Sequence, residues 1–269
     1  MNRTRRHWTL IAGVAVAIGS GAALGQAAIT RAIDATLPDA RGINLFNRPG
    51  TITLLSSNGK VIQKLGPATR EKIKPGQMPQ LVMQSFIAAE DRRFFDHDGV
   101  DVWGIGRAVV TNLKQGSVRE GASTITQQLA RTVFLSQDRT VTRKLKEAAL
   151  AYKLERQLSK EQILEQYLNF VYLGSSAYGV SDAAWVYFSK QPEDLTLPEA
   201  ALIAGMPPAP SLYSPLVNPE IALQRRSIVL SRMEQEGFIT SSEAEQARNS
   251  PLALKPAIPK YYNSTAPYF

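Results

Sequence analysis

The feature that most constrains the fold of this chain is an uncharged segment close to its N-terminus. Trp8–Ile29 reads WTLIAGVAVAIGSGAALGQAAI and contains no acidic or basic side chain. As an α-helix these 22 residues would be about 33 Å long, enough to cross a hydrocarbon core of about 30 Å. Backbone polar groups inside a bilayer have to be paired within the segment, which requires a helix. The sequence therefore predicts a membrane-spanning helix at residues 8–29.

The charges that flank this segment predict its orientation. Residues 1–7 carry Arg3, Arg5 and Arg6, whereas the charges that follow the segment are mixed. An excess of arginine before the span favours a cytoplasmic tail at 1–7 and an extracytoplasmic location for the rest of the chain. A cleaved signal peptide is the alternative, but its apolar region is usually shorter than this one. We expect an uncleaved, single-pass anchor in the cytoplasmic membrane.

Composition narrows the class of partner. The chain has 31 basic and 23 acidic residues, a formal net charge of +8, and no cysteine. A basic protein at a membrane attracts anionic lipid head groups and phosphates. No nucleic-acid recognition motif accompanies the charge, so we expect membrane lipids and no nucleic acid as partners. The absence of cysteine excludes disulfides and thiolate metal sites.

Local patterns divide the remaining chain into three parts. Residues 30–74 are expected to form a stalk and a β-hairpin, because apolar residues alternate around Asn58-Gly59. Residues 75–250 read as one mainly α domain, in which the prolines between 207 and 215 predict an extended crossing segment. Residues 251–269 are proline-spaced and read as a linker-like tail.

One carboxylate within the helical part is placed where an apolar side chain is expected. Val82, Phe86 and Glu90 follow one another at intervals of four residues and so share a helix face. A carboxyl group on such a stripe loses water, which raises its pKa toward the range that proton transfer uses. The alternative is a solvated Glu90 at a frayed helix end, paired with Arg93. The pattern alone favours that alternative.

Two polar segments further along indicate anion binding. GASTITQQLAR, residues 121–131, places hydroxyl and amide side chains at a helix start, where free N–H groups favour anions; ordinary N-caps are the alternative. In RTVTRKLKE, residues 139–147, Arg139, Arg143 and Glu147 share a helix face. A solvated ladder of ion pairs is the alternative there, and the pattern alone favours that ladder.

Five segments, in this order, resemble the motifs of the peptidoglycan glycosyltransferases of family 51. This family comprises the glycan-polymerising domains of class A penicillin-binding proteins and the monofunctional transglycosylases. The resemblance covers roughly residues 75–245 and implies a lysozyme-like helical glycosyltransferase domain on the outer face of the bacterial cytoplasmic membrane. The segments are EDRRFFDHDG (90–99), GASTITQQLA (121–130), RKLKE (143–147), KEQILEQYLN (160–169) and YLGSSAYGVSDAAWVYFSK (172–190).

The resemblance also implies a reaction. Its substrates would be lipid II, a disaccharide-peptide on undecaprenyl pyrophosphate, and the growing glycan strand. Glu90 would take the proton of the acceptor 4-hydroxyl, which attacks the donor anomeric carbon with inversion and expels the lipid pyrophosphate. Glu147 matches the second catalytic carboxylate and would orient cations or a divalent metal, Mg²⁺ or Mn²⁺. No cofactor is otherwise implied.

The expected substrate-binding residues follow from the motifs and from the need of a departing pyrophosphate for cations. The Gly-broken apolar segment 100–110 is expected to contact the membrane surface. A transpeptidase domain or other cell-wall synthesis proteins are the expected partners. The predicted substrate-binding residues are Asp91, Arg93, Ser123, Thr124, Gln127, Gln128, Arg131, Arg139, Arg143, Lys144, Asn169, Tyr172 and Gly174.

Three serines depart from the family pattern. Ser189 replaces a usual glycine, and Ser175-Ser176 replaces a pair such as Asn-Gly. A serine matters at such a position if the backbone needs a positive φ angle. Two other functions remain open at this point: a lysozyme-like, glycan-cleaving enzyme with Glu90 as general acid, and a non-catalytic, membrane-anchored scaffold that binds lipid II.

Overall fold

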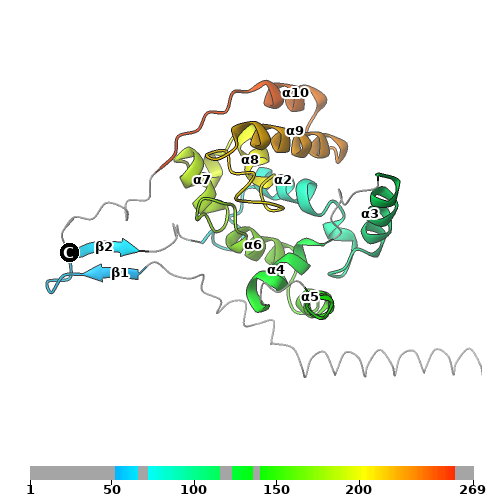
Figure 1. The fold of residues 1–269 in the computed structure, drawn as a ribbon, viewed down its shortest axis with the longest axis horizontal. Helices are drawn as coiled ribbons and strands as arrows, with labels where there is room; N and C mark the ends of the chain where they lie inside the picture. Colours follow the sequence, from blue (N-terminus) through cyan, green and yellow to red (C-terminus); the bar gives the residue numbers. More distant parts are fainter. Residues whose placement is uncertain (1–51, 66–71, 116–122, 136–139, 258–269) are drawn as a thin grey trace, which may run out of the picture.

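The computed structural model describes residues 52–65, 72–115, 123–135 and 140–257 (Figure 1). The predicted basic tail, membrane span and most of the stalk lie outside these residues, as does Arg139. Among the helices of the described ranges, none is both long and apolar enough to cross a membrane.

A two-stranded hairpin precedes the helices. Strands β1 (Ile52–Leu55) and β2 (Val61–Leu65) pair antiparallel on either side of the Asn58-Gly59 turn, in which Gly59 has a φ of 80°. The rest of the described chain is mainly helical, as the sequence predicts. The helices are α2 (Gln80–Glu90), α3 (Val102–Gln115), α4 (Ile125–Phe134), α5 (Val141–Glu155), α6 (Lys160–Phe170), α7 (Val180–Phe188), α8 (Leu197–Ala204), α9 (Pro219–Gln235) and α10 (Ser241–Asn249), with 3₁₀ turns at Phe94–Asp96 and Pro192–Asp194.

The apolar stripe of α2 is the centre of the core. Val82 and Phe86 are each 1% exposed, and α2 packs against α8 and α9. Helix α4 packs against α5 and α6 (Figure 1). The stripe therefore faces the interior as predicted, and Glu90 lies where α2 ends.

The segment between α8 and α9 differs from the sequence prediction. It is not extended but folds into consecutive turns, with Ala209 N–H donating to Met206 C=O (3.1 Å) and Tyr213 N–H donating to Ala209 C=O (2.8 Å). Proline restricts φ to about −65°, a value that suits turn positions as well as extended chain. These turns carry Pro207, Pro208 and Tyr213 back toward the end of α2.

The three serines that depart from the family pattern all occupy left-handed backbone. Their φ angles are 47° at Ser175, 62° at Ser176 and 54° at Ser189. Two have side-chain contacts across the fold: Ser175 Oγ lies 3.1 Å from Ser214 Oγ, and Ser189 Oγ donates to Lys255 C=O at 2.7 Å. Ser176 is exposed.

Replacing Ser176 by glycine is expected to stabilise the protein. Removing Cβ relieves left-handed strain of about 1–2 kcal/mol, and the greater freedom of glycine in the unfolded chain offsets part of it. We expect a gain of about 0.5–1 kcal/mol in the free energy of unfolding, measured by urea denaturation. Ser176→Ala, which keeps Cβ, is the control. Equal stability of the two variants would contradict the strain argument.

Candidate active site

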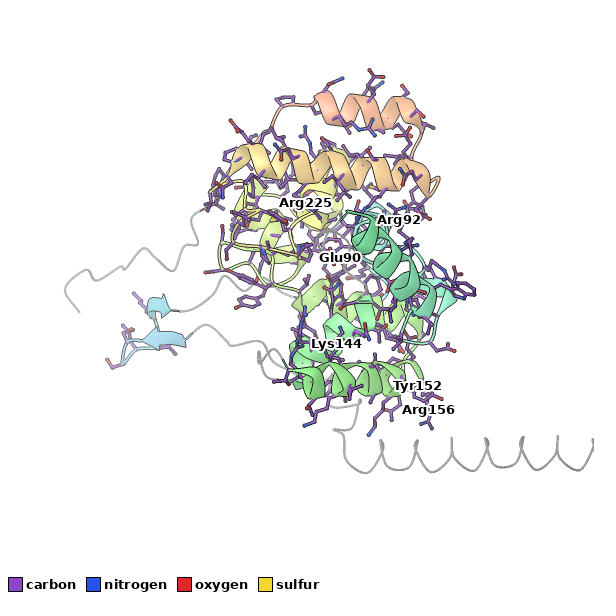
Figure 2. All side chains as sticks on the ribbon, turned by 45° about the vertical axis from the view of Figure 1, so that its right-hand side comes forward. Glu90, Arg92, Lys144, Tyr152, Arg156 and Arg225 are labelled. Atoms are coloured by element: carbon purple, nitrogen blue, oxygen red, sulfur yellow. The ribbon has the colours of Figure 1, made fainter. Side chains whose placement is uncertain are left out.

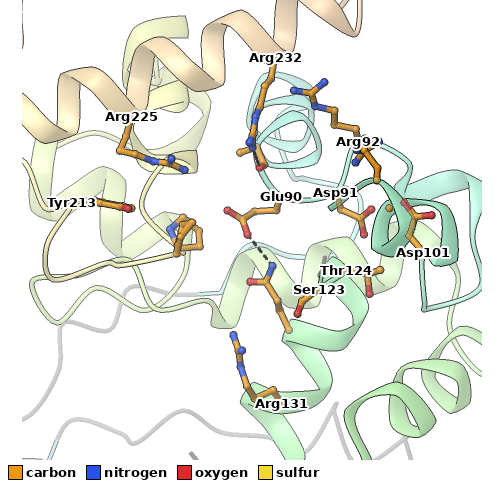
Figure 3. Close-up of a pocket in the computed structure, with 16 residues that line it drawn as sticks. Glu90, Asp91, Arg92, Asp101, Ser123, Thr124, Arg131, Tyr213, Arg225 and Arg232 are labelled. Carbon is orange, nitrogen blue, oxygen red and sulfur yellow. Dashed lines mark hydrogen bonds between the residues drawn. The ribbon is translucent and has the colours of Figure 1, made fainter. Parts of the chain in front are cut away.

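A cleft opens at the C-terminal end of α2 (Figure 3). Its volume is about 350 Å³, and its walls come from α2, α3, α4, α9 and the turns between α8 and α9. Side chains with charged or polar groups dominate the lining. The lining includes Glu90, Ser123, Gln128, Arg131, Tyr213, Arg225 and Arg232.

Glu90 is held in this cleft by an amide from α4. Gln128 Nε2 donates to Glu90 Oε2 at 2.8 Å, and Gln128 Oε1 accepts from the Tyr167 hydroxyl at 3.1 Å. The Tyr167 ring is 1% exposed and packs edge-on against Phe86. Because a hydroxyl donor faces the amide oxygen, the amide nitrogen of Gln128 is left to face Glu90. Three helices thus orient one carboxylate.

The surroundings of Glu90 raise its pKa. Loss of water is the largest cause; the hydrogen bond from Gln128 and the positive charges of Arg225 and Arg232 oppose it, and the negative charge of Asp91 adds to it. The predicted direction is confirmed. The alternative pairing with Arg93 is not formed, because Arg93 Nη1 donates to Asp101 Oδ1 at 3.1 Å.

Asp91 and His97 link the end of α2 to the start of α4. Asp91 is 7% exposed and its Oδ2 accepts from Ile125 N–H at 2.9 Å. Gly99 N–H donates to His97 Nδ1 at 3.2 Å, so Nε2 carries the ring proton and donates to Asp91 at 3.1 Å. Asp91 therefore fixes the two helix ends that carry Glu90 and Gln128. Its contact with substrate stays a prediction.

A cluster of cations lies where α4 and α5 meet. Arg131 lines the cleft, and Lys144 Nζ donates to Ser123 Oγ (2.6 Å) and to Glu147 Oε2 (2.8 Å). Burial, and then the positive charges of Arg131 and Arg143, lower the pKa of Lys144. The predicted Ser123 and Arg131 therefore line one side of the cleft, and Lys144, which is not part of the lining, contacts Ser123 there.

Glu147 holds these cations in place. Its side chain is 1% exposed; Oε1 faces Arg143 and Oε2 faces Lys144. Of the ladder in the sequence alternative, the pair of Arg143 and Glu147 is formed and is buried rather than solvated, and Arg139 lies outside the described residues. With both oxygens engaged by cations, Glu147 does not fit a metal ion, and no cluster of three acidic or histidine side chains suited to a metal occurs in the described residues.

Gln127 and Asn169, both predicted to bind substrate, have structural partners. Gln127 is 3% exposed and closes the capping box of α4: its Oε1 accepts from Thr124 N–H at 3.1 Å, and its own N–H donates to Thr124 Oγ1 at 3.1 Å. The Asn169 amide makes two hydrogen bonds with the backbone of Ile73, at 2.9 and 3.0 Å. These hydrogen bonds account for the burial of both polar side chains, so neither position requires a ligand to explain it.

Tyr172 and Gly174 also lie outside the cleft lining. The Tyr172 ring packs against Tyr178 at a centroid distance of 4.9 Å. Gly174 has a φ of 77°, and a Cβ there would lie 2.5 Å from Pro210 C=O. Both residues shape the turn before α7 and the packing of the segment between α8 and α9.

The sequence motifs predict no residue in the part of the site that α9 contributes. Arg225 and Arg232 line the cleft opposite Arg131 (Figure 3), and Tyr213 joins them from the turns. The two arginines are seven residues apart, which places them on the same helix face. That spacing was the available signal, but no motif marks it.

Comparisons with known proteins identify the family of the chain. A family model described as transglycosylase matches residues 58–234. Penicillin-binding protein 1A of Neisseria lactamica is 49% identical over 216 residues, 80% of this chain and 27% of that protein. Penicillin-binding protein 1A of Aquifex aeolicus is 45% identical over 219 residues, 81% of this chain and 30% of that protein. A crystal structure of penicillin-binding protein 1A from Haemophilus influenzae is 25% identical, with a TM-score of 0.46 over 80% of this chain and 22% of that one.

The chain spans less than a third of the length of these curated relatives. The family match covers residues on both sides of the cleft, from before α2 into α9. It includes Glu90, Gln128, Arg131 and Glu147. The chain belongs to the transglycosylase family, the peptidoglycan glycosyltransferases whose five motifs its sequence resembles.

Proposed function

We propose that this domain polymerises lipid II into β-1,4 glycan strands and releases undecaprenyl pyrophosphate. The observation that carries the proposal is the placement of Glu90: a carboxylate held by Gln128, with its pKa raised, in a cleft that has cations on two sides. A base of this kind serves a reaction that removes a proton from a sugar hydroxyl while a negative charge departs.

The chemical step uses the two sides of the cleft differently. Ionised Glu90 takes the proton of the acceptor 4-hydroxyl, whose oxygen forms a bond with the donor anomeric carbon. The bond from that carbon to the pyrophosphate breaks, and its electron pair leaves with the phosphate oxygen. Arg131 and Lys144 stabilise that charge, and Glu147 positions Lys144.

The cationic side also separates this proposal from glycan cleavage. A lysozyme-like enzyme with Glu90 as general acid would release a sugar hydroxyl, which carries no charge for Arg131 and Lys144 to stabilise. A scaffold that only binds lipid II has no use for a carboxylate with a raised pKa.

The proposed location is the outer face of the bacterial cytoplasmic membrane, where lipid II would be held by its lipid. The start of α3 supports contact with lipid: Val102 is 73% and Trp103 78% exposed, while Gly104 from the same turn lines the cleft. Exposed tryptophan at a helix start suits the membrane–water interface. A transpeptidase domain is the proposed partner.

Mixing the full chain, in detergent or vesicles, with labelled lipid II is expected to produce long glycan strands and undecaprenyl pyrophosphate. Gel electrophoresis of the labelled strands and thin-layer chromatography of the lipid would measure both products. Preformed glycan strands serve as the second substrate. Shortening of those strands without polymer from lipid II would establish the cleavage alternative, and binding without either product would establish the scaffold.

A further inference from the structure

Arg225 is held rigidly with its charge directed into the cleft. Its Nε donates to Gly205 C=O at 3.3 Å, and its guanidinium lies over the Tyr213 ring, 5.0 Å from the centroid. Figure 3 shows the guanidinium pointing from α9 toward Glu90. Three separate parts of the chain, α9, the end of α8 and the turns after it, therefore fix one cation.

The packing beneath Arg225 leaves it little freedom to move away. A Cβ built on Gly205 would lie 3.2 Å from Arg225 Cβ, so the end of α8 and the face of α9 are in close contact. Stacking on an aromatic face further orients a guanidinium and reduces its loss of entropy on binding. The charge of Arg225 is therefore already in place before substrate binds. Fixed charges of this kind stabilise a reaction most effectively, because they do not have to reorganise during it.

The other arginines near Glu90 have different engagements. Arg232 Nη1 donates to Ala89 C=O at the end of α2, and Arg92 Nη1 donates to Gln235 Oε1 at 3.1 Å with Glu236 at 3.6 Å. Arg131 lies on the side assigned to pyrophosphate. The titratable and charged groups that act on Glu90 or line its cleft are Asp91, Arg92, Asp101, Arg107, Arg131, Tyr167, Arg225 and Arg232.

We propose that Arg225 is a positioning residue for the reaction: from a fixed place on α9 it keeps the Glu90 carboxyl group ionised, so that Glu90 acts as base although the cleft removes water from it. The inference rests on the proposed role of Glu90. Without a nearby cation, a desolvated carboxyl group binds a proton and cannot accept one from the acceptor hydroxyl. Arg225 is among the charges that lower the pKa of Glu90.

The test compares the pH dependence of three variants in the full chain. Arg225→Gln removes the charge, Arg225→Lys keeps a charge on a different side chain, and Arg156→Gln removes an exposed arginine from the far end of α5, away from Glu90 (Figure 2). Polymerisation rates are measured from acid to alkaline pH. The Glu90 carboxyl group is titrated separately by ¹³C NMR in wild type and in Arg225→Gln, a readout that needs no substrate.

Loss of the Arg225 charge is expected to move the acid limb of the rate profile to higher pH, because the neutral form of Glu90 is then favoured. On that limb Arg225→Gln should be about threefold slower or more, and it should approach the wild-type rate at alkaline pH. Arg225→Lys should recover most of the shift, and Arg156→Gln should follow wild type. The NMR titration of Arg225→Gln should move in the same direction.

Two results would overturn the inference. An unchanged NMR titration of Glu90 in Arg225→Gln would mean that Arg225 does not control its ionisation. A rate loss equal at every pH would mean that Arg225 contacts substrate instead. Failure of the proposed function is distinguishable, since wild type itself would then form no polymer from lipid II while the NMR titration could still be read.

Discussion

Replacing Glu90 by glutamine is expected to abolish glycan polymerisation and leave the fold intact. Glutamine has the same shape and can still accept the hydrogen bond from Gln128, but it cannot take a proton. Removal of a general base costs about 10²–10⁴-fold in rate. Polymer formation from lipid II measures the loss, with Glu245→Gln on the exposed face of α10 as a matched control. Full activity of Glu90→Gln would end the assignment of the base.

The same variant should be more stable than wild type at neutral pH. Burial raises the pKa of Glu90 in the folded protein above its unfolded value. The folded state therefore favours the protonated form, and wild type loses stability as pH rises from the unfolded pKa through the folded one. Glutamine carries no charge at any of these pH values, so its burial has no such pH-dependent cost. The advantage of Glu90→Gln in the free energy of unfolding should grow over that range and then stay constant; a difference independent of pH would contradict it.

The second large effect is expected at Arg131, and it should exceed the effect at Arg143. Arg131 lines the cleft, whereas Arg143 faces the buried Glu147. Loss of a group that stabilises transition-state charge costs about 10²–10³-fold in rate, so we expect about a 100-fold lower kcat/KM for Arg131→Ala. Arg143→Ala acts only through Glu147 and Lys144. It should lower the rate by about tenfold or less and also reduce stability, because it removes one cation from the buried Glu147.

Steady-state rates at varied lipid II concentration, with circular dichroism to check folding, would measure both variants. Arg156→Ala, at the exposed residue that directly follows α5, is the control for loss of an arginine. Equal losses at Arg131 and Arg143 would mean that both contact the departing pyrophosphate. A larger loss at Arg143 would contradict the division between a cleft cation and a cation held by Glu147.

Periodicity and capping patterns predicted much of this fold because they are local. The stripe of Val82 and Phe86 is buried as expected, and the capping pair Ser159 and Gln162 begins α6. The turns after α8 were not predicted, because proline limits φ but leaves the direction of the chain to packing.

The candidate site was predicted on one side only. The motifs led to Glu90, Gln128 and Arg131, which come from consecutive parts of the chain. Arg225 comes from a helix more than 130 residues after Glu90 and reaches the cleft only because α9 packs on α2. Conversely, Gln127 is in a motif but serves the helix cap, since a polar side chain at a helix start has a structural use as well as a chemical one.

The hydrogen bond of Ser189 to the tail gives the domain a mechanical property. Lys255 N–H and Ala257 N–H donate to the carbonyls of Tyr187 and Val186, at 2.9 and 3.2 Å, beside the bond from Ser189. A pulling force applied at residue 257 is therefore borne by the end of α7. None of the described residues that line the cleft comes from α7. Tension in the chain after residue 257 would act first on these hydrogen bonds. The distance between Glu90 and the cleft arginines would stay unchanged.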